Sequence, residues 1–303
     1  MRPSSRASAR RAPWSALPLL GAWGCSRLDS IPHVPPETAE TWLAGQPSAR
    51  LGIGAWQIVL VQPSTSFIVY LLGLMTIGVG VLFLRIRGRE RSRLWWGIGL
   101  LLWGVGALLA GTSYQAFSYA IKCEGRPACV WTSWWEVIYL VLTIASVNAL
   151  LRAVALACSV GRRRRALSLL ALANTAAYLL VALVGALVPV RLLISFELML
   201  LFAAPTVAIC FVLNGLRYRA QRASLDLALL GAWAWLGLTL GAYTLYGATG
   251  IAQALWARGV WFSENDVLHV GLLLWMVYLA RFVATRLVDA QVPSRGAARE
   301  AAA

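Results

Sequence analysis

Long apolar segments, separated by short connections rich in arginine, are the feature that most constrains the fold of this chain. A helix needs about 20 apolar residues to cross a bilayer. Hydrophobic residues make up 59% of the 303 residues and charged residues only 13%, a composition too apolar for a soluble domain of this size. Seven stretches are long enough to span, at about 66–84, 94–119, 134–157, 166–188, 192–213, 225–251 and 267–283. The sequence therefore predicts an all-α, polytopic membrane protein with a bundle of seven transmembrane helices.

The distribution of basic residues predicts the orientation of these helices, because short cytoplasmic connections are enriched in Lys and Arg. Arginine clusters follow the first, third, fifth and seventh segments, at 85–93, 161–165, 217–222 and 281–286. The alternate connections hold two or fewer basic residues each, at 122–129, 189–191 and 257–266. We therefore expect the amino terminus outside and the carboxyl terminus in the cytoplasm.

The same charge pattern predicts partners and location. The net charge of +15 resides in short clusters between apolar runs and not along one polar face. Such clusters are typical of membrane topology, so we expect contacts with membrane lipids, including anionic headgroups at the cytoplasmic face, and none with nucleic acid. We expect a multi-pass protein of a cell membrane, specifically the bacterial inner membrane.

Both ends of the chain lie outside the predicted membrane domain at 65–287. Residues 1–25 join basic residues to a short apolar run and resemble a signal peptide, and "AWGC", ending at Cys25, loosely resembles a lipobox. Cleavage, lipidation of Cys25 and an uncleaved anchor remain open. Residues 26–64 form an outer tail whose apolar part, 51–61, is too short to span and is expected to lie at the interface as a helix or a strand. Residues 288–303 predict a disordered cytoplasmic tail.

The cysteines divide according to the predicted side of the membrane. Cys123 and Cys129 share one outer connection and are close enough in sequence to close a small ring, so a disulfide bond is expected between them. Cys158 and Cys210 lie near predicted inner helix ends and are expected to be free thiols.

Charged side chains within the apolar segments are few, and each costs about 2.5 to 3.5 kcal/mol at the centre of a bilayer. Glu136 and Asp266 each follow a serine by three residues, the spacing of a capping box, so they cap a helix, line a site, or do both. Glu197 is expected about 10 Å beyond the start of its helix near Pro189, which is too deep for a cap. His269 is expected at a similar depth, where it can pair with Glu197.

Three other charged residues have a local explanation. Arg152 and Arg281 lie near predicted cytoplasmic helix ends, where arginine side chains can reach the headgroups. Asp226 follows Ser224 beside an arginine-rich connection, where a helix cap or a surface ion pair is sufficient. We therefore expect no functional role for these three residues.

Polar and aromatic residues concentrate at the predicted outer ends of the helices, which favours an outward-facing polar pocket. The candidate pocket residues are Ser113, Tyr114, Gln115, Glu136, Tyr119, Tyr139, Glu197, Tyr243, Tyr246, Asp266 and His269. The alternative is a belt of interfacial residues that face the headgroups, since tyrosine and tryptophan are enriched there in any membrane protein.

The stretch "SENDVLHVGLLLW" (263–275), the seven segments and the polar ends of the second and third segments resemble the CREST group of seven-helix membrane proteins. This group includes the alkaline ceramidases and the progestin and adiponectin receptor relatives. The resemblance implies three histidines around zinc, two of them four residues apart in the seventh helix. Here Leu273 stands four residues after His269, and the second segment has no histidine. We therefore expect no zinc and no other cofactor, and only His269 is carried over, as a ligand of a divergent site that the pocket carboxylates would complete.

Three functions remain open at this point, and whether the chain is an enzyme is left undecided. The first is a membrane protein that binds or senses a lipid or small amphiphile in the outer pocket. The second is a membrane hydrolase of lipid amides or esters, in which a carboxylate and His269 activate water. The third is a transporter that uses Glu197 as its ionisable group. The only lysine, Lys122, lies in an outer connection, so the seventh helix lacks the Schiff-base residue of a retinal protein.

Overall fold

The computed structural model describes residues 25–53 and 56–291. Within this part of the chain, seven helices are long and apolar enough to cross a membrane. They are α3 (Pro63–Arg85), α4 (Arg91–Ala110), α6 (Trp134–Cys158), α7 (Gly161–Leu187), α8 (Phe196–Gln221), α9 (Ser224–Ala248) and α11 (Glu264–Tyr278). Two of them continue into π-helical turns, α4 into η2 (Gly111–Ala116) and α11 into η4 (Leu279–Val283). The predicted all-α bundle is confirmed, and it indicates a multi-pass membrane protein.

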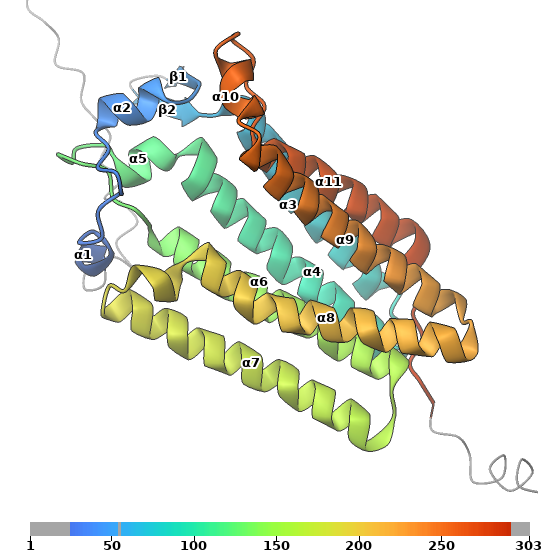
Figure 1. Ribbon diagram of the computed structural model, residues 1–303. Coiled ribbons are helices and arrows are strands. Elements are labelled where there is room, and N and C mark those ends of the chain that lie inside the picture. Colours follow the sequence, from blue (N-terminus) through green and yellow to red (C-terminus); the bar gives the residue numbers. More distant parts are fainter. Residues whose placement is uncertain (1–24, 54–55, 292–303) are drawn as a thin grey trace, which may run out of the picture.

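The short elements gather at one end of the bundle (Figure 1). They are α1 (Cys25–Leu28), α2 (Ala39–Ala44), β1 (Ser48–Ile53), β2 (Trp56–Val61), α5 (Ser118–Lys122), η3 (Arg191–Ile194) and α10 (Ile251–Trp256). We call this end the disulfide end, because the loop after α5 carries the bond between Cys123 and Cys129. The opposite end, where α3, α6 and α8 finish in or beside arginine-rich connections, is called the arginine end.

The segment that precedes α3 is a β-hairpin. β1 pairs with β2 in antiparallel register from Ser48 opposite Val61 to Ile53 opposite Trp56. The strand alternative for residues 51–61 is therefore confirmed. Pro63 occupies the first turn of α3, where its missing N–H costs no hydrogen bond, so the helix begins three residues before the predicted start.

The helix α2 packs near α5 and is capped at its amino end. Thr38 is its N-cap and forms a reciprocal capping box with Thr41. A backbone hydrogen bond and the Thr38 hydroxyl lower the pKa of the exposed Glu40 carboxyl in the first turn. The cap thus favours the ionised carboxylate at this helix terminus.

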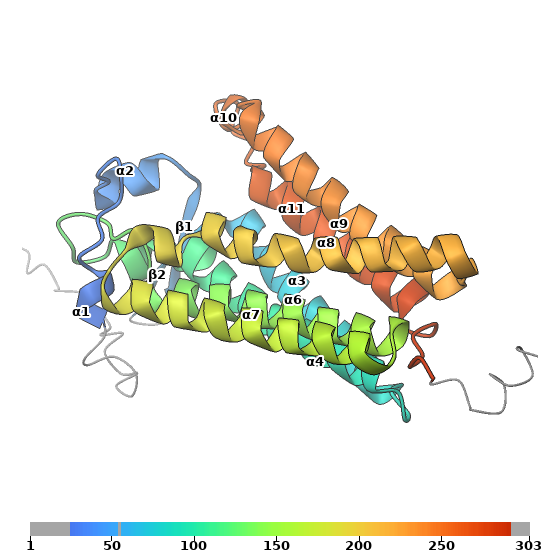
Figure 2. The same cartoon turned by 60° about the horizontal axis from the view of Figure 1, so that its bottom comes forward.

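Six of the long helices form a ring. Along it, α3 packs against α4, α4 against α6, α6 against α8, α8 against α9, α9 against α11, and α11 against α3. The seventh long helix, α7, packs outside this ring against α6 (Figure 2). Helix α7 is accordingly one of the least buried of the seven.

Glycines allow α3 and α4 to pack closely. A Cβ atom added at Gly80 would lie 3.1 Å from the carbonyl oxygen of Gly97, and one added at Gly97 would lie 3.0 Å from the carbonyl oxygen of Gly80. Farther along the same seam, a Cβ atom at Gly104 would lie 2.8 Å from the carbonyl oxygen of Gly73. These glycines explain the close packing of the two helices, because small residues let two backbones approach.

The main hydrophobic core fills the half of the ring nearer to the arginine end. At its centre, the buried rings of Phe83, Trp96 and Trp233 stack, with centroids 5.6 Å apart for the first pair and 6.0 Å for the second. The indole of Trp275 donates to the backbone oxygen of Ala232, which fixes α11 against α9. Aromatic packing and directed hydrogen bonds therefore hold this half of the bundle together.

Asp226, at the start of α9, is fully buried below this core. Its carboxylate accepts hydrogen bonds from Asn214 at 3.0 Å and from Arg217 at 3.2 Å. The indole of Trp233 in turn donates to Asn214. The expectation of a helix cap or surface pair at Asp226 is wrong, because two residues of α8 bind this carboxylate inside the bundle.

Helix α9 leaves the packed core as it approaches the disulfide end. Its last buried residue is Thr239, although the helix continues to Ala248. Figure 1 and Figure 2 both show α8 and α9 diverging from the arginine end. The ring is therefore closed around a core at one end, whereas the last turns of α9 at the other end contain no buried residue.

The chain ends carry two predictions that lie outside the described residues. Residues 1–24 and 292–303 include nearly all of the signal-peptide-like segment and most of the expected cytoplasmic tail. Cys25 begins α1. Cleavage, lipidation and disorder stay predictions.

Candidate functional site

Glu136, in the first turn of α6, is buried beside the only lysine of the chain. Lys122 Nζ lies 2.5 Å from Glu136 Oε1, and the two side chains are 4% and 2% exposed. The hydroxyls of Ser113 and Thr132 donate to the two carboxylate oxygens at 2.8 and 2.9 Å. This buried carboxylate is therefore neutralised and hydrogen-bonded, as its burial requires. The network fixes η2, α5 and α6 to one another.

The surroundings of Lys122 hold its ammonium in place. The ammonium lies 4.8 Å from the ring centroid of Tyr114 and 5.7 Å from that of Trp42 in α2, both within cation–π range. The disulfide bond between Cys123 and Cys129 closes the loop directly after Lys122, with Cα atoms 4.3 Å apart. The predicted disulfide is confirmed, and both free thiols, Cys158 and Cys210, are present as expected.

The two predicted capping boxes have different outcomes. Ser133 is the N-cap of α6, but its side chain makes no capping bond and instead lies 2.7 Å from the Ser113 hydroxyl. Capping by Glu136 is therefore wrong, because Lys122 and two hydroxyls occupy its carboxylate. At α11 the box is confirmed: Asp266 Oδ2 accepts the backbone N–H of Ser263 at 2.7 Å.

Helix α11 also carries two buried polar atoms that lack a hydrogen-bond partner within the described chain. His269 is 8% exposed and Asp266 is 1% exposed. His269 Nδ1 and Asp266 Oδ1 have no hydrogen-bond partner within the described part of the chain. Because buried polar atoms are nearly always bonded, these two atoms mark a place for water or a polar ligand.

Glu197 lies nearer to its helix terminus than the sequence predicts. The 3₁₀ turn η3 precedes α8, which begins only at Phe196, so Glu197 is in the first turn and its side chain is exposed. The argument for a deep intramembrane carboxylate is therefore wrong. No hydrogen bond or ion pair among the described residues joins Glu197 to His269, so their convergence on one cavity stays a prediction.

Two tyrosines from different elements lie close enough to Glu197 for its charge to act on their phenols, and a third tyrosine packs on one of them. The phenols of Tyr114 in η2 and Tyr243 in α9 both lie within electrostatic range of its carboxylate. Tyr139 in α6 packs edge-to-face on Tyr114 with centroids 6.1 Å apart and lies within electrostatic range of Tyr243. We call these four residues the tyrosine recess.

The side chains of the tyrosine recess remain accessible. Tyr114 is 36% exposed although its ring contacts both Lys122 and Tyr139, and the other two phenols are half-buried. Within residues 25–53 and 56–291, no hydrogen bond uses the phenol oxygens of Tyr114 and Tyr243 or the Glu197 carboxylate, whereas Thr143 hydrogen-bonds to the side chain of Tyr139. Three polar groups on three helical elements are thus free to bind a ligand.

The remaining predicted pocket residues lie at the disulfide end in varied surroundings. Gln115 is buried, and its Oε1 is without a protein partner in the described chain. Tyr119 is half-buried in α5. Tyr246 donates from its hydroxyl to the backbone oxygen of Phe262 at 2.8 Å, so it ties α9 to the segment before α11. Tyr246 is therefore less available for binding than the tyrosines of the recess.

Sequence reasoning missed Lys122 as a functional residue. The chain contains 27 Lys and Arg residues, and Lys122 is its only lysine, next to a cysteine predicted to form a disulfide. That position was a usable signal, since a disulfide-closed loop can hold a charged side chain inward. The partner could not be identified, because Glu136 carries a local capping pattern.

Among the described residues, no group of three or more His, Cys, Asp or Glu side chains is arranged to hold a metal ion. The absence of a zinc site stays a prediction. No family model, curated protein or solved structure matches the chain. The resemblance to the CREST group therefore stays a hypothesis, and function is argued from the site itself.

Proposed function

We propose that this chain is a multi-pass membrane protein that binds a lipid or small amphiphile in the tyrosine recess. The observation that carries the proposal is the set of three free polar groups on η2, α8 and α9, with the ring of Tyr139 in α6 packed against Tyr114. Their hydroxyl and carboxylate oxygens can bind a polar head, and apolar side chains that α8 and α9 expose, such as Leu201 and Leu245, can contact an apolar tail. Ligand sites commonly combine apolar walls with a few placed polar groups.

The charges around the recess favour a neutral or cationic head. Glu136 is neutralised by Lys122, whereas Glu197 is exposed and has no ion-pair partner within the described chain. The net charge facing a ligand is therefore negative. An anionic head would be repelled, while hydroxyl and ammonium groups can donate to Glu197 and to the phenol oxygens.

The proposed orientation places the disulfide end outside and the arginine end in the cytoplasm. Disulfide bonds persist in oxidising compartments, and short arginine-rich connections are retained on the cytoplasmic side. In a bacterium, this arrangement corresponds to the inner membrane with the tyrosine recess open to the outer leaflet.

Binding of a monoacylglycerol to the purified protein, followed by native mass spectrometry, tests the proposal. The triple variant Tyr114→Phe, Tyr139→Phe, Tyr243→Phe removes three hydroxyls and leaves the rings. Each lost hydrogen bond is worth about 1 kcal/mol, so we expect affinity to fall at least tenfold. Tyr218→Phe at the arginine end is the matched control and should bind normally. Unchanged affinity of the triple variant would refute the proposal.

The contribution of Glu197 is measured with a long-chain alkylamine in place of the monoacylglycerol. Glu197→Gln removes the charge and keeps the shape. A charged hydrogen bond is worth about 1.5 to 3 kcal/mol, so the amine should bind about tenfold more weakly, while monoacylglycerol binding should change little. Equal losses for both ligands would contradict a role for the Glu197 charge.

Hydrolysis of a lipid amide or ester is a second candidate, favoured by the unpartnered His269 Nδ1 beside Asp266. These groups could position and deprotonate water, a contribution typically of about 10²- to 10⁴-fold in rate. The test is release of a fluorophore from a short-chain acyl ester and from the matching amide. Hydrolysis that falls at least a hundredfold in His269→Gln supports this candidate, whereas no hydrolysis above a detergent blank eliminates it.

A further inference from the structure

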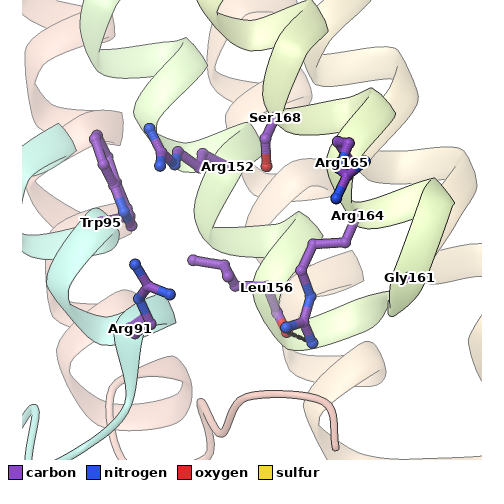
Figure 3. Close-up of a pocket in the computed structure, with 8 residues that line it drawn as sticks. All are labelled: Arg91, Trp95, Arg152, Leu156, Gly161, Arg164, Arg165 and Ser168. Atoms are coloured by element: carbon purple, nitrogen blue, oxygen red, sulfur yellow. Dashed lines mark hydrogen bonds between the residues drawn. The ribbon is translucent and has the colours of Figure 1, made fainter. Parts of the chain in front are cut away.

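A cavity at the arginine end is lined by basic side chains from three helices. It has a volume of about 300 Å³. Its lining residues are Arg91, Trp95, Arg152, Leu156, Gly161, Arg164, Arg165 and Ser168 (Figure 3). We call it the arginine cavity. Four of its eight lining residues are arginines and none is acidic, so it presents a concentrated positive charge.

Three of these guanidinium groups are free to bind a ligand. None of the ion pairs in the described chain includes Arg91, Arg152 or Arg165, and none of the three side chains donates a hydrogen bond there. The hydroxyl of Ser168 is also unbonded within the described chain, and Figure 3 shows it between Arg152 and Arg165. Three cations and a hydroxyl that line one cavity without a protein acceptor offer a site for an anion.

The protein holds the surrounding groups in position. Arg152 lies over the ring of Trp95, with its guanidinium carbon 4.0 Å from the centroid. Arg164 donates to the backbone oxygens of Ser159, Leu156 and Ala290, so it serves as a wall of the cavity. The cavity is therefore preorganised before a ligand arrives.

Two carboxylates beside Arg91 already accept hydrogen bonds from backbone N–H groups. Asp289 accepts the backbone N–H groups of Arg91 and Ser92 at the start of α4, at 2.9 and 2.8 Å. Glu90 in turn accepts the backbone N–H of Asp289. Asp289 thus caps the start of α4 and Glu90 holds the backbone of Asp289, and neither acid forms an ion pair with the guanidiniums of the arginine cavity.

The size and position of the cavity indicate the ligand. A water molecule occupies about 30 Å³, so the volume of about 300 Å³ accommodates a phosphate group with its substituents. Directly after Ser168, α7 exposes Leu169, Leu170 and Leu172, an apolar surface suited to acyl chains. We propose that the arginine cavity binds the phosphate of an anionic phospholipid headgroup whose chains lie along α7.

This proposal is independent of the tyrosine recess, and native mass spectrometry with defined lipids tests it. The protein is mixed in detergent with phosphatidylglycerol, with phosphatidylcholine, or with inorganic phosphate alone. We expect retention of phosphatidylglycerol and weaker retention of phosphatidylcholine, because its choline would meet the arginines. Inorganic phosphate alone should not be retained.

The decisive variant is Arg152→Gln combined with Arg165→Gln. Affinity for phosphatidylglycerol should fall at least tenfold, because two charge-assisted contacts are lost. The control is Arg162→Gln combined with Arg219→Gln, which removes the same charge at two exposed positions outside the cavity lining. The single variant Arg165→Gln, on the exposed side of α7, tests the cavity if the double variant does not fold.

Three results would overturn the proposal. Equal loss in the control pair would mean that binding follows net charge and not the cavity. Retention of phosphatidylglycerol by both cavity variants would locate the lipid elsewhere. Displacement of phosphatidylglycerol by millimolar phosphate, with phosphate bound at comparable affinity, would mean that the cavity serves a soluble phosphate compound.

Discussion

At the disulfide end, the buried carboxylate of Glu136 is matched by Lys122 and two hydroxyls, whereas at the arginine end Arg152 and Arg165 line one cavity that has no carboxylate in its lining. The difference shows that a buried charged group and a charged group at a helix end have different requirements for a partner. A group buried among helices must be paired, because its desolvation is too costly otherwise. Arginines at a helix end can remain unpaired because they reach solvent and headgroups.

The two ends also differ in what holds them together. The arginine end has the main hydrophobic core and the buried carboxylate of Asp226. The disulfide end has a small ion-pair network and a covalent bond beside it. We therefore expect the disulfide end to be more sensitive to loss of a single polar partner.

Lys122→Met should cause the largest loss of stability. It leaves the Glu136 carboxylate buried with only hydroxyl donors, and breaking a buried ion pair in this way costs about 3 to 5 kcal/mol. Unfolding by SDS in mixed micelles measures the change. The double variant Lys122→Met, Glu136→Gln should recover much of the loss, because both charges are removed together. A loss no greater than that of Arg219→Gln would contradict the structural role of the pair.

Asp226→Ala tests the equivalent buried group at the arginine end. It removes one acceptor from Asn214 and one from Arg217, at a cost of about 2 to 3 kcal/mol in the same SDS assay. The effect should be smaller than that of Lys122→Met, because the Arg217 side chain is 20% exposed and can find water. Asp226→Asn keeps the shape and should lose less. A larger loss at Asp226 than at Lys122 would reverse the comparison.

Removal of the disulfide, by Cys123→Ala with Cys129→Ala, should cost about 2 kcal/mol. The bond joins residues only six apart, and a loop this short restricts the unfolded chain modestly. The loss should be confined to the disulfide end, so phosphatidylglycerol binding at the arginine cavity should not change. Loss of that binding would show that the two ends are coupled.

Gly80→Ala should have the smallest effect, about 1 kcal/mol, because the new methyl group meets α4 backbone atoms at 3.1 Å. Gly78→Ala in the same helix is the control, since a Cβ atom there has nothing within 4 Å. Gly78→Ala should be neutral or slightly stabilising. Equal effects of the two substitutions would contradict close packing of α3 on α4.

The fold was predictable because hydropathy along one segment is a local property. The seven spans follow from apolar length, and the capping box at Ser263 and Asp266 follows from spacing. The same spacing failed at Ser133 and Glu136, where groups from η2 and α5 bind the serine and the glutamate. A pattern of neighbouring residues cannot show whether a residue far away in the sequence binds the same side chains.

The sites were predictable only in part. The tyrosines were identified as candidates, but the depth of Glu197 was wrong because η3 delays the start of α8. Ser195, whose hydroxyl caps the backbone N–H of Leu198, was the local signal for that later start. The arginine cavity was not predictable, because it depends on how α4, α6 and α7 come together.

We propose that the two ends of the bundle prefer ligands of opposite charge, and one competition experiment tests this proposal. The protein is exposed to an equimolar mixture of phosphatidylglycerol and a long-chain alkylamine, and both adducts are quantified by native mass spectrometry. We predict that Arg152→Gln with Arg165→Gln loses only phosphatidylglycerol and that Glu197→Gln loses only the amine. Loss of the same ligand in both variants, or of neither ligand in either, would contradict the account.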